Sequence, residues 1–253
     1  MDGERALVTG STAGIGRAIA VMFAREGARV AVTGRNAERG NAVVDEIAAN
    51  GGDAVFLPAN LHDEAACNRL VDDAAARFGG LTVLVNNAAV VDGIDAGIAE
   101  LTTEAWEKIL RVDLTAPMWL ARAAIRHMRA GGHGAIVNVS SRQAEQASRG
   151  LTAYIAAKAG LNGLTRSIAV EEARHNIRCN AISPGYVIND RRDAEMSHDK
   201  RERREAMHLT RLGVADDVAY AAVYLASRES EFLTGVNLQL DGGSSIARGA
   251  TLG

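Results

Sequence analysis

A tyrosine and a lysine, Tyr154 and Lys158, stand four residues apart at the start of a helix-like segment. Residues with this spacing share one face of a helix, so the phenol and the ammonium are expected to lie close together. A free phenol ionises only near pH ~10, and a cation beside it favours the phenolate. Such a tyrosine could exchange a proton with a reacting oxygen. A serine hydroxyl, from Ser140 or Ser141 after an apolar run, could hold that oxygen by a hydrogen bond.

A glycine-rich turn over residues 9–16, Thr-Gly-Ser-Thr-Ala-Gly-Ile-Gly, follows the first apolar run and precedes a helix-like segment. Glycines at this place let the backbone turn tightly and approach a pyrophosphate closely. The N–H groups at the start of the next helix face such an anion. The turn therefore predicts a dinucleotide-binding site, with the spacing Gly-x-x-x-Gly-x-Gly.

Short strand-like and helix-like segments alternate along the chain and must position these groups. The strands are rich in Val, Ile and Leu and do not alternate with polar residues, which indicates a parallel sheet buried on both faces. We expect an α/β fold: one doubly wound Rossmann domain over 1–253, with a central parallel sheet and helices on both faces. The expected strands are 6–8, 30–32, 54–57, 83–85, 136–139, 179–182 and 236–240, and the expected helices are 15–26, 37–50, 64–77, 104–129, 154–172 and 215–227.

The composition argues against several classes of partner. The 253 residues are 47% hydrophobic and 23% charged with a net charge of −3, which favours neither nucleic acid nor an anionic membrane as partner. No apolar run is long enough to cross a bilayer, and the first residues do not resemble a signal peptide. Two distant cysteines, Cys67 and Cys179, fit a reducing cytoplasm. The six histidines show no metal-type spacing, so no metal site is expected.

The glycine turn resembles the TGxxxGxG motif of the short-chain dehydrogenase/reductase family, and four later segments resemble family motifs in the same order. These are Asn-Asn-Ala-Ala at 86–89, the Tyr-x-x-x-Lys pair, Ser-Pro-Gly at 183–185 and Leu-Asp-Gly-Gly at 240–243. The resemblance extends over nearly the whole chain and is closest in kind to 3-oxoacyl-thioester reductases. It implies an oxidoreductase that transfers a hydride between a nicotinamide cofactor and a ketone or secondary alcohol.

The resemblance also assigns roles to residues. Ser141, thirteen residues before Tyr154, is preferred to Ser140 as the substrate-holding serine; Tyr154 is the acid and base, and Lys158 also binds the nicotinamide ribose. Asp113 stands where the family usually has an asparagine in its proton relay, and Asn189 stands where it often has a threonine. The residues expected at the cofactor are Gly10, Ser11, Thr12, Gly14, Ile15, Gly16, Arg35, Asn60, Leu61, Asn87, Ala88, Tyr154, Lys158, Pro184, Gly185 and Val187.

The end of the second expected strand predicts which nicotinamide cofactor binds. NAD enzymes usually place a carboxylate there for the ribose hydroxyls, but this chain has Gly34 followed by Arg35. A guanidinium binds a ribose phosphate that a carboxylate would repel. We therefore predict NADP(H), with NAD(H) as the alternative.

The substrate is left open among 3-oxoacyl thioesters, steroids, sugars and polyols. The charged stretch 191–209 follows the Ser-Pro-Gly loop and is either a solvated helix or a lid over a small carbonyl or alcohol substrate, in which case His198 and His208 could touch it. A cofactor-binding sensor without catalysis is the competing function. The resemblance further implies a homotetramer built through segments 215–227 and 235–243.

Overall fold

The computed structural model describes residues 1–90, 93–189 and 193–247. Within this part of the chain, seven strands form one fully parallel sheet in the order β3-β2-β1-β4-β5-β6-β7. The strands are β1 Arg5–Val8, β2 Arg29–Gly34, β3 Ala54–Pro58, β4 Val83–Asn86, β5 Gly134–Val139, β6 Ile177–Pro184 and β7 Asn237–Leu240. The helices are α1 Gly14–Arg25, α2 Ala37–Ala49, α3 Glu64–Phe78, α4 Thr103–Leu110, α5 Ala116–Gly131, α6 Thr152–Glu172, α7 His198–Glu205 and α8 Ala215–Ala226. The predicted doubly wound α/β fold is confirmed.

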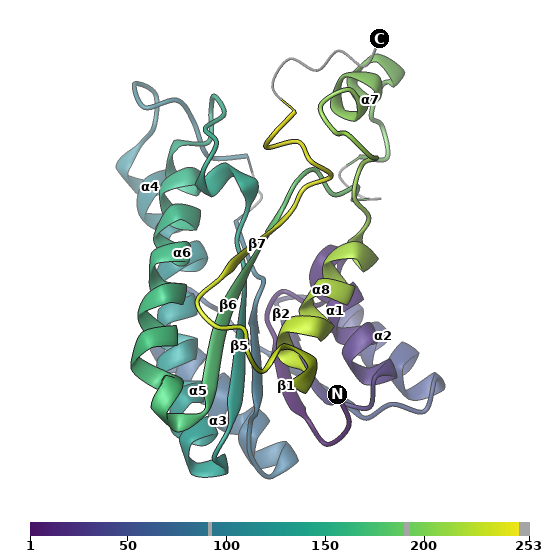
Figure 1. Ribbon diagram of the computed structural model, residues 1–253, viewed down its shortest axis with the longest axis vertical. Helices are drawn as coiled ribbons and strands as arrows, with labels where there is room; N and C mark the ends of the chain where they lie inside the picture. Colours follow the sequence, from purple (N-terminus) through teal and green to yellow (C-terminus); the bar gives the residue numbers. More distant parts are fainter. Residues whose placement is uncertain (91–92, 190–192, 248–253) are drawn as a thin grey trace.

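Two apolar clusters, one on each face of the sheet, form the core. Alternate strand residues divide between them, so Val30 and Val32 join the cluster under α1, α2 and α8, whereas Ala31 joins the cluster under α3, α5 and α6. Figure 1 shows these two helix layers on opposite sides of the strands. Burial on both faces explains why the strands read as continuous apolar runs. The edge strands β3 and β7 are exceptions, because most of their residues are only half-buried.

One predicted helix contains a local change of helix type. The stretch expected as helical over 104–129 is helical throughout and consists of α4, a π-helical turn Arg111–Thr115, and α5. The apolar spacing continues through this turn, so periodicity did not reveal it, although Pro117 at the start of α5 is a start signal. Such π-helical turns are frequent at functional sites, and this one carries Asp113.

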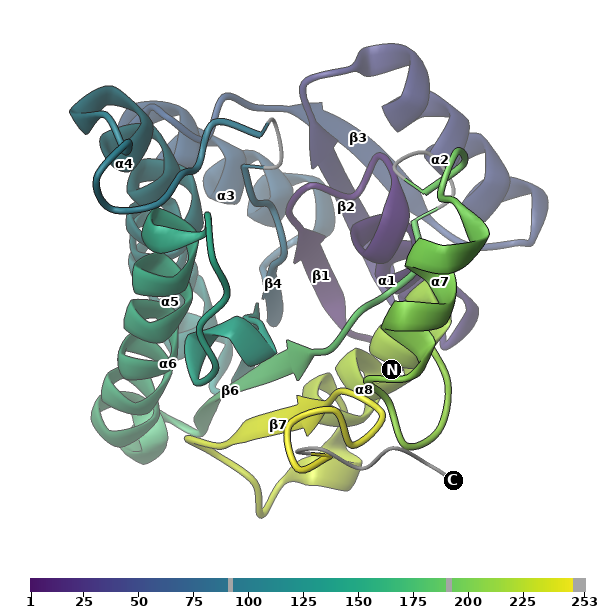
Figure 2. The same ribbon diagram turned by 90° about the horizontal axis from the view of Figure 1, so that it is seen from above.

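The strand order places a reversal between β1 and β4, and ligands of open α/β sheets bind at the carboxyl ends of strands at such a point. The glycine turn after β1, the segment after β4 and the serines after β5 all meet at this edge. Figure 2 looks onto it from above, and α7 stands beyond it on the side of α1 and α8 (Figure 1, Figure 2).

Two bidentate ion pairs fasten helices to their neighbours. Arg129 of α5 holds Glu172 at the end of α6, with Nε 2.8 Å from Oε2, and this hydrogen bond lowers the pKa of Glu172 despite its burial. Arg211 makes two 2.7 Å hydrogen bonds to Asp217 in the first turn of α8. Hydrogen bonding from Arg211 lowers the pKa of Asp217.

Candidate active site

The glycine turn packs so tightly on the segment after β4 that side chains are excluded from it. Gly10 has φ +64°, and a Cβ there would lie 2.9 Å from the Cα of Ala88. A Cβ at Gly16 would lie 2.9 Å from the carbonyl carbon of Gly10, and closer still to its oxygen. The N-cap of α1 is Ala13, which has no side-chain acceptor for the first-turn N–H groups. A bare loop leading into an uncapped helix start fits the pyrophosphate of a dinucleotide.

A threonine and an asparagine hold this turn in place. The hydroxyl of Thr9 donates to the Val85 carbonyl at 3.1 Å and accepts from the N–H of Asn87 at 2.9 Å and of Ala88 at 3.1 Å. In return, Nδ2 of Asn87 donates to the carbonyl of Thr9 at 2.8 Å. The ends of β1 and β4 are thereby joined. Asn87 and Ala88, which were both predicted at the cofactor, lie against the glycine turn.

The predicted adenosine side of the site lies at the ends of β2 and β3. Ser11 is fully buried, and its hydroxyl accepts from Thr33 N at 2.9 Å and donates to backbone, so it fixes the turn to β2. At Gly34 a Cβ would lie 2.6 Å from Cγ2 of Thr12, so the place of the usual carboxylate is filled by Thr12. Arg35, the next residue, is exposed.

Asn60 and Leu61, both predicted at the cofactor, follow β3. The Asn60 side chain accepts a 3.2 Å hydrogen bond from the N–H of His62, which shapes the turn, and Leu61 is half-buried. Both residues belong to the same edge of the sheet as Arg35, because β3 pairs with β2 through to Pro58.

Tyr154 and Lys158 lie in the first turns of α6 on one face, as their spacing predicts. The Nζ atom of Lys158 lies 5.5 Å from the centroid of the Tyr154 ring. Lys158 is only 2% exposed, and its ammonium donates to the carbonyl of Val139, at the end of β5, at 3.0 Å. The half-buried phenol therefore shares its surroundings with a buried ammonium group.

Asp113 is fully buried in the π-helical turn and lies beside the lysine. Its Oδ2 is 3.8 Å from Nζ of Lys158, and its Oδ1 accepts a 2.8 Å hydrogen bond from the N–H of Val90. The carboxylate is therefore close enough to form an ion pair with the ammonium group of Lys158. Any part that it has in a proton relay stays a prediction.

The two serines after β5 have different partners. Ser140 donates to the backbone carbonyl of Lys158 at 3.3 Å and is buried, so its hydroxyl ties β5 to α6. The Ser141 hydroxyl accepts from Gln143 N at 3.1 Å and caps the 3-10 helix Arg142–Ala144, which packs against α6. A serine hydroxyl that accepts one hydrogen bond still has its proton to donate, which suits Ser141 for the predicted role.

The loop after β6 lies against the end of β7. The N–H of Gly185 donates to Leu240 at 3.0 Å, and a Cβ at Gly185 would lie 2.7 Å from the Cα of Asp241. Burial raises the pKa of Asp241, but hydrogen bonds from three following residues outweigh it, and the net shift is downward. Pro184, Gly185 and Val187 were predicted at the cofactor; Gly185 packs on the end of β7, and Val187 pairs with Gly213.

The predicted lid stretch 191–209 contains α7, which is charged and exposed, while residues 191 and 192 lie outside the described part of the chain. At its base, the Tyr186 hydroxyl donates to Asp193 at 2.5 Å, and the Arg204 guanidinium stacks 3.7 Å from the Tyr186 ring centroid. His208 is buried, with Nδ1 2.7 Å from the Arg204 carbonyl, so it supports the lid base. His198 is exposed on α7.

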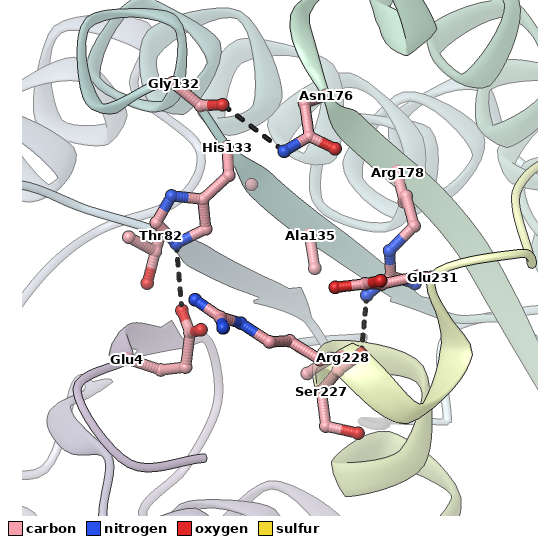
Figure 3. Close-up of a pocket in the computed structure, with 12 residues that line it drawn as sticks. Glu4, Thr82, Gly132, His133, Ala135, Asn176, Arg178, Ser227, Arg228 and Glu231 are labelled. Atoms are coloured by element: carbon pink, nitrogen blue, oxygen red, sulfur yellow. Dashed lines mark hydrogen bonds and ion pairs between the residues drawn. The ribbon is translucent and has the colours of Figure 1, made fainter.

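A pocket of about 220 Å³ lies at the opposite, amino-terminal edge of the sheet (Figure 3). Its charged side chains have partners within the fold. Glu4 lies 3.6 Å from His133, and Arg178 donates to backbone carbonyls at the end of α8. The site chemistry described above lies at the other ends of the strands.

Two other properties concern only the described residues. One group of side chains there, His198, Asp199 and Glu202, is close enough together to hold a metal ion, and all three are exposed on α7.

No helix in the described part of the chain combines the length and the apolar character needed to cross a membrane.

Sequence reasoning gave no role to several polar residues that build the site. Asn138 bridges Asn86, at 2.9 Å, and Thr165, at 2.8 Å, inside the core below it. Asp95 accepts hydrogen bonds from the first turn of α6. The role of Asp241 could have been predicted from the sequence, because the run Gly-Gly-Ser-Ser after it supplies hydrogen-bond donors within reach of its carboxylate. Asn138 and Asp95 bond to residues far away in the sequence, so no local pattern indicates their roles.

Fold and site together define a Rossmann-type α/β protein whose glycine turn and tyrosine–lysine pair share one edge of the sheet. Residues 10–245 match the family described as enoyl-(acyl carrier protein) reductase. The chain is 36% identical over 247 residues to a 2,5-dichloro-2,5-cyclohexadiene-1,4-diol dehydrogenase of Sphingobium indicum, covering 97% of this chain and 98% of the relative. It is 34% identical over 241 residues to a 3-oxoacyl-[acyl-carrier-protein] reductase of Chlamydia pneumoniae, covering 95% and 96%.

A solved structure is also similar: a 7α-hydroxysteroid dehydrogenase complexed with NADH and 7-oxo glycochenodeoxycholic acid. It has a TM-score of 0.89 and 32% identity, and the match covers 96% of this chain and 94% of that one. The chain belongs to the short-chain dehydrogenase/reductase family, the NAD(P)-dependent oxidoreductases of alcohols and ketones.

Proposed function

We propose that this enzyme interconverts a ketone and a secondary alcohol with NADP(H), and that Tyr154 is its general acid and base. The observation that carries the proposal is the buried ammonium of Lys158, 5.5 Å from the Tyr154 ring, at the edge that also holds the glycine turn. When bound, the nicotinamide would supply or accept the hydride. Tyr154 would give its proton to the new alkoxide, or take one from an alcohol.

Two neighbours complete the proposed chemistry. Ser141 would donate a hydrogen bond to the substrate oxygen and hold it for the transfer. Lys158, paired with Asp113 and anchored on the carbonyl of Val139, would stabilise negative charge on the Tyr154 oxygen and bind the ribose. Asp113 acts on Tyr154 through the lysine in this arrangement.

The preference for NADP(H) rests on the end of β2. Gly34 offers no carboxylate to repel a ribose phosphate, and the exposed guanidinium of Arg35 follows it. Arg35→Ala is expected to weaken NADPH binding by about tenfold or more, the value of one charge-assisted contact, and to leave NADH binding unchanged. Arg25→Ala, at the far end of α1, is the matched control. Equal losses for both cofactors would contradict the preference.

The substrate class remains a choice among those suggested by the relatives. The curated relatives are named for a 3-oxoacyl carrier-protein substrate and a cyclic diol, and the structural relative holds a steroid. All are ketones or secondary alcohols, the feature that the proposed tyrosine requires. We propose such a small carbonyl or alcohol as the substrate, with the stretch 193–209 as part of its lid.

The assembly we propose is a homotetramer. Three large aromatic side chains on or just after α8 are exposed: Tyr220 at 63%, Tyr224 at 42% and Phe232 fully. Tyr220 and Tyr224 lie in the segment 215–227 and Phe232 lies shortly before the segment 235–243, so these exposed aromatic side chains support a contact between copies there. Sedimentation of the wild type as a monomer at micromolar concentration would contradict the proposal.

The proposed cytoplasmic location rests on the cysteines. Both Cys67 and Cys179 are free and buried, and burial raises the pKa of Cys179 to about 12, so its thiol stays protonated. Free thiols fit a reducing compartment.

A spectrophotometric screen tests the proposal as a whole. NADPH oxidation is followed with 3-oxoacyl thioesters, oxo-steroids, ketoses and simple ketones, and NADPH binding is measured separately by fluorescence. We expect turnover with at least one class. Tight NADPH binding without turnover of any carbonyl would refute catalysis and favour a cofactor sensor.

A further inference from the structure

The start of α6, which carries Tyr154, is capped by a residue from another part of the chain. The N-cap residue Leu151 has no side-chain acceptor. Instead, Oδ1 of Asp95 accepts from the N–H of Ala153 at 3.1 Å, and Oδ2 accepts from the N–H of Tyr154 at 2.9 Å. The carbonyl of Ala96 accepts from Thr152 at 3.4 Å. Three first-turn donors of α6 are therefore satisfied from the segment after β4.

This cap acts on the backbone of the tyrosine itself. A carboxylate at a helix N-terminus is stabilised by hydrogen bonds to the first-turn N–H groups and by their partial positive charge. Because the N–H of Tyr154 is one of the two donors, the place of its Cα, and of the phenol that extends from it, depends on Asp95. Asp95 also accepts from its own neighbour, Ala96 N, at 2.9 Å, which holds the carboxylate in this orientation.

The same segment of chain also reaches the lysine side of the site. Val90 donates to Asp113, whose carboxylate lies 3.8 Å from Nζ of Lys158. Ile94 and Leu101 pack on a small apolar cluster that includes residues 109, 153 and 157. Residues after β4 therefore contact α6 both at its first turn and, through Asp113, at Lys158.

We propose that Asp95 is a positioning residue for the reaction. From the segment after β4 it caps the first turn of α6 and thereby fixes the position of Tyr154. The inference rests on the proposed function of Tyr154. Catalytic groups displaced by about 1 Å can lose up to about 100-fold in rate, so a lost cap affects turnover more than binding. The hydrogen bonds described for Asp95 go to Ala96 and to the first turn of α6, and not to the glycine turn.

Asp95→Asn and Asp95→Ala test the role. An amide has one acceptor oxygen, so the asparagine variant leaves Ala153 N or Tyr154 N without its partner, and the alanine variant leaves both. The matched control is Asp63→Ala, because Asp63 is the N-cap residue of α3 and its Oδ1 accepts from Ala65 N at 2.7 Å and from Ala66 N at 3.3 Å, away from the catalytic set.

Three measurements are made on each protein: kcat with the best ketone from the screen, NADPH affinity by fluorescence, and hydrogen–deuterium exchange of the peptide 152–158. For Asp95→Asn we expect kcat to fall about tenfold, with NADPH affinity within about twofold of the wild type, and exchange of 152–158 to speed up. Asp95→Ala should lose more of each. Asp63→Ala should keep the wild-type kcat and speed exchange at the start of α3, not at 152–158.

The inference is overturned if Asp95→Asn has the wild-type kcat, or if its exchange at 152–158 is unchanged. The exchange measurement needs no substrate, and Asp95→Asn supplies it where Asp95→Ala folds poorly and exchanges faster throughout. Tyr154→Phe separates the two levels: full turnover of that variant refutes the proposed function, whereas its inactivity beside a normal Asp95→Asn refutes only the positioning role.

Discussion

Gly16→Ala puts one methyl group into the tightest contact of the cofactor site. The new Cβ would lie 2.9 Å from the carbonyl carbon of Gly10, and it would overlap the oxygen of that carbonyl and Nδ2 of Asn87. Relief requires either a shift of the glycine turn or rotation of Asn87 away from its hydrogen bonds to Thr9 and Gly10.

The size of the effect follows from these contacts. Two lost hydrogen bonds at about 0.5–1.5 kcal/mol each, or an overpacked contact at about 1–3 kcal/mol, give the same range. For a chain of this length, about 2 kcal/mol lowers the melting temperature by about 4–8 °C. Because the distorted turn is the proposed pyrophosphate cradle, NADPH affinity should fall by about 10- to 100-fold, which equals about 1.4–2.7 kcal/mol.

Fluorescence titration with NADPH and thermal unfolding measure both effects. The control is Gly163→Ala in α6, where a Cβ meets nothing within 4 Å. There the same substitution should stabilise the protein by about 0.5–1 kcal/mol and leave NADPH affinity unchanged. Wild-type affinity and melting in Gly16→Ala would refute the tight packing of the turn and its role as the cradle.

Two further predictions concern buried charge. Arg129 lowers the pKa of Glu172 in the folded protein. The Arg129–Glu172 ion pair therefore contributes fully to the free energy of unfolding above the pKa of an unfolded glutamate, about 4.3, and this contribution is lost as the pH falls through the lower pKa of the folded state. Urea unfolding should therefore show the wild type more stable than Glu172→Gln at pH 7, with the gap closing below about pH 4; a gap independent of pH would contradict this. Asp113→Asn leaves the charge of Lys158 buried without its carboxylate partner at 3.8 Å, so it should cost about 3 kcal/mol. Part of that loss should return in the double variant with Lys158→Met, and additive losses would show that the two groups do not interact.

The sheet could be predicted from the sequence because its signal is local. Runs such as 30–32 and 83–85 are apolar throughout because they are buried on both faces of the sheet. The glycine turn can be recognised in the sequence because a close backbone contact requires glycines at these positions. The proximity of Tyr154 and Lys158 follows from helix geometry alone. Each of these inferences depends on fewer than a dozen neighbouring residues.

The rest of the site depends on contacts between distant segments. The π-helical turn at Arg111–Thr115 leaves the apolar spacing intact, so it carries no periodic signal. The cap that Asp95 places on Tyr154 spans 59 residues, and the pairing of Asp113 with Lys158 depends on how two helices pack. Local patterns contain no information on such pairs, which therefore appear only in the folded chain.

The central claim is that Tyr154 exchanges the proton beside the cation of Lys158. The most direct test is single-turnover oxidation of bound NADPH by the best ketone in Tyr154→Phe, with NADPH affinity measured on the same sample. Loss of the phenol should slow the reduction by at least about 100-fold, the usual value of a general acid, while NADPH still binds. A Tyr154→Phe protein that reduces the ketone at the wild-type rate would contradict the account.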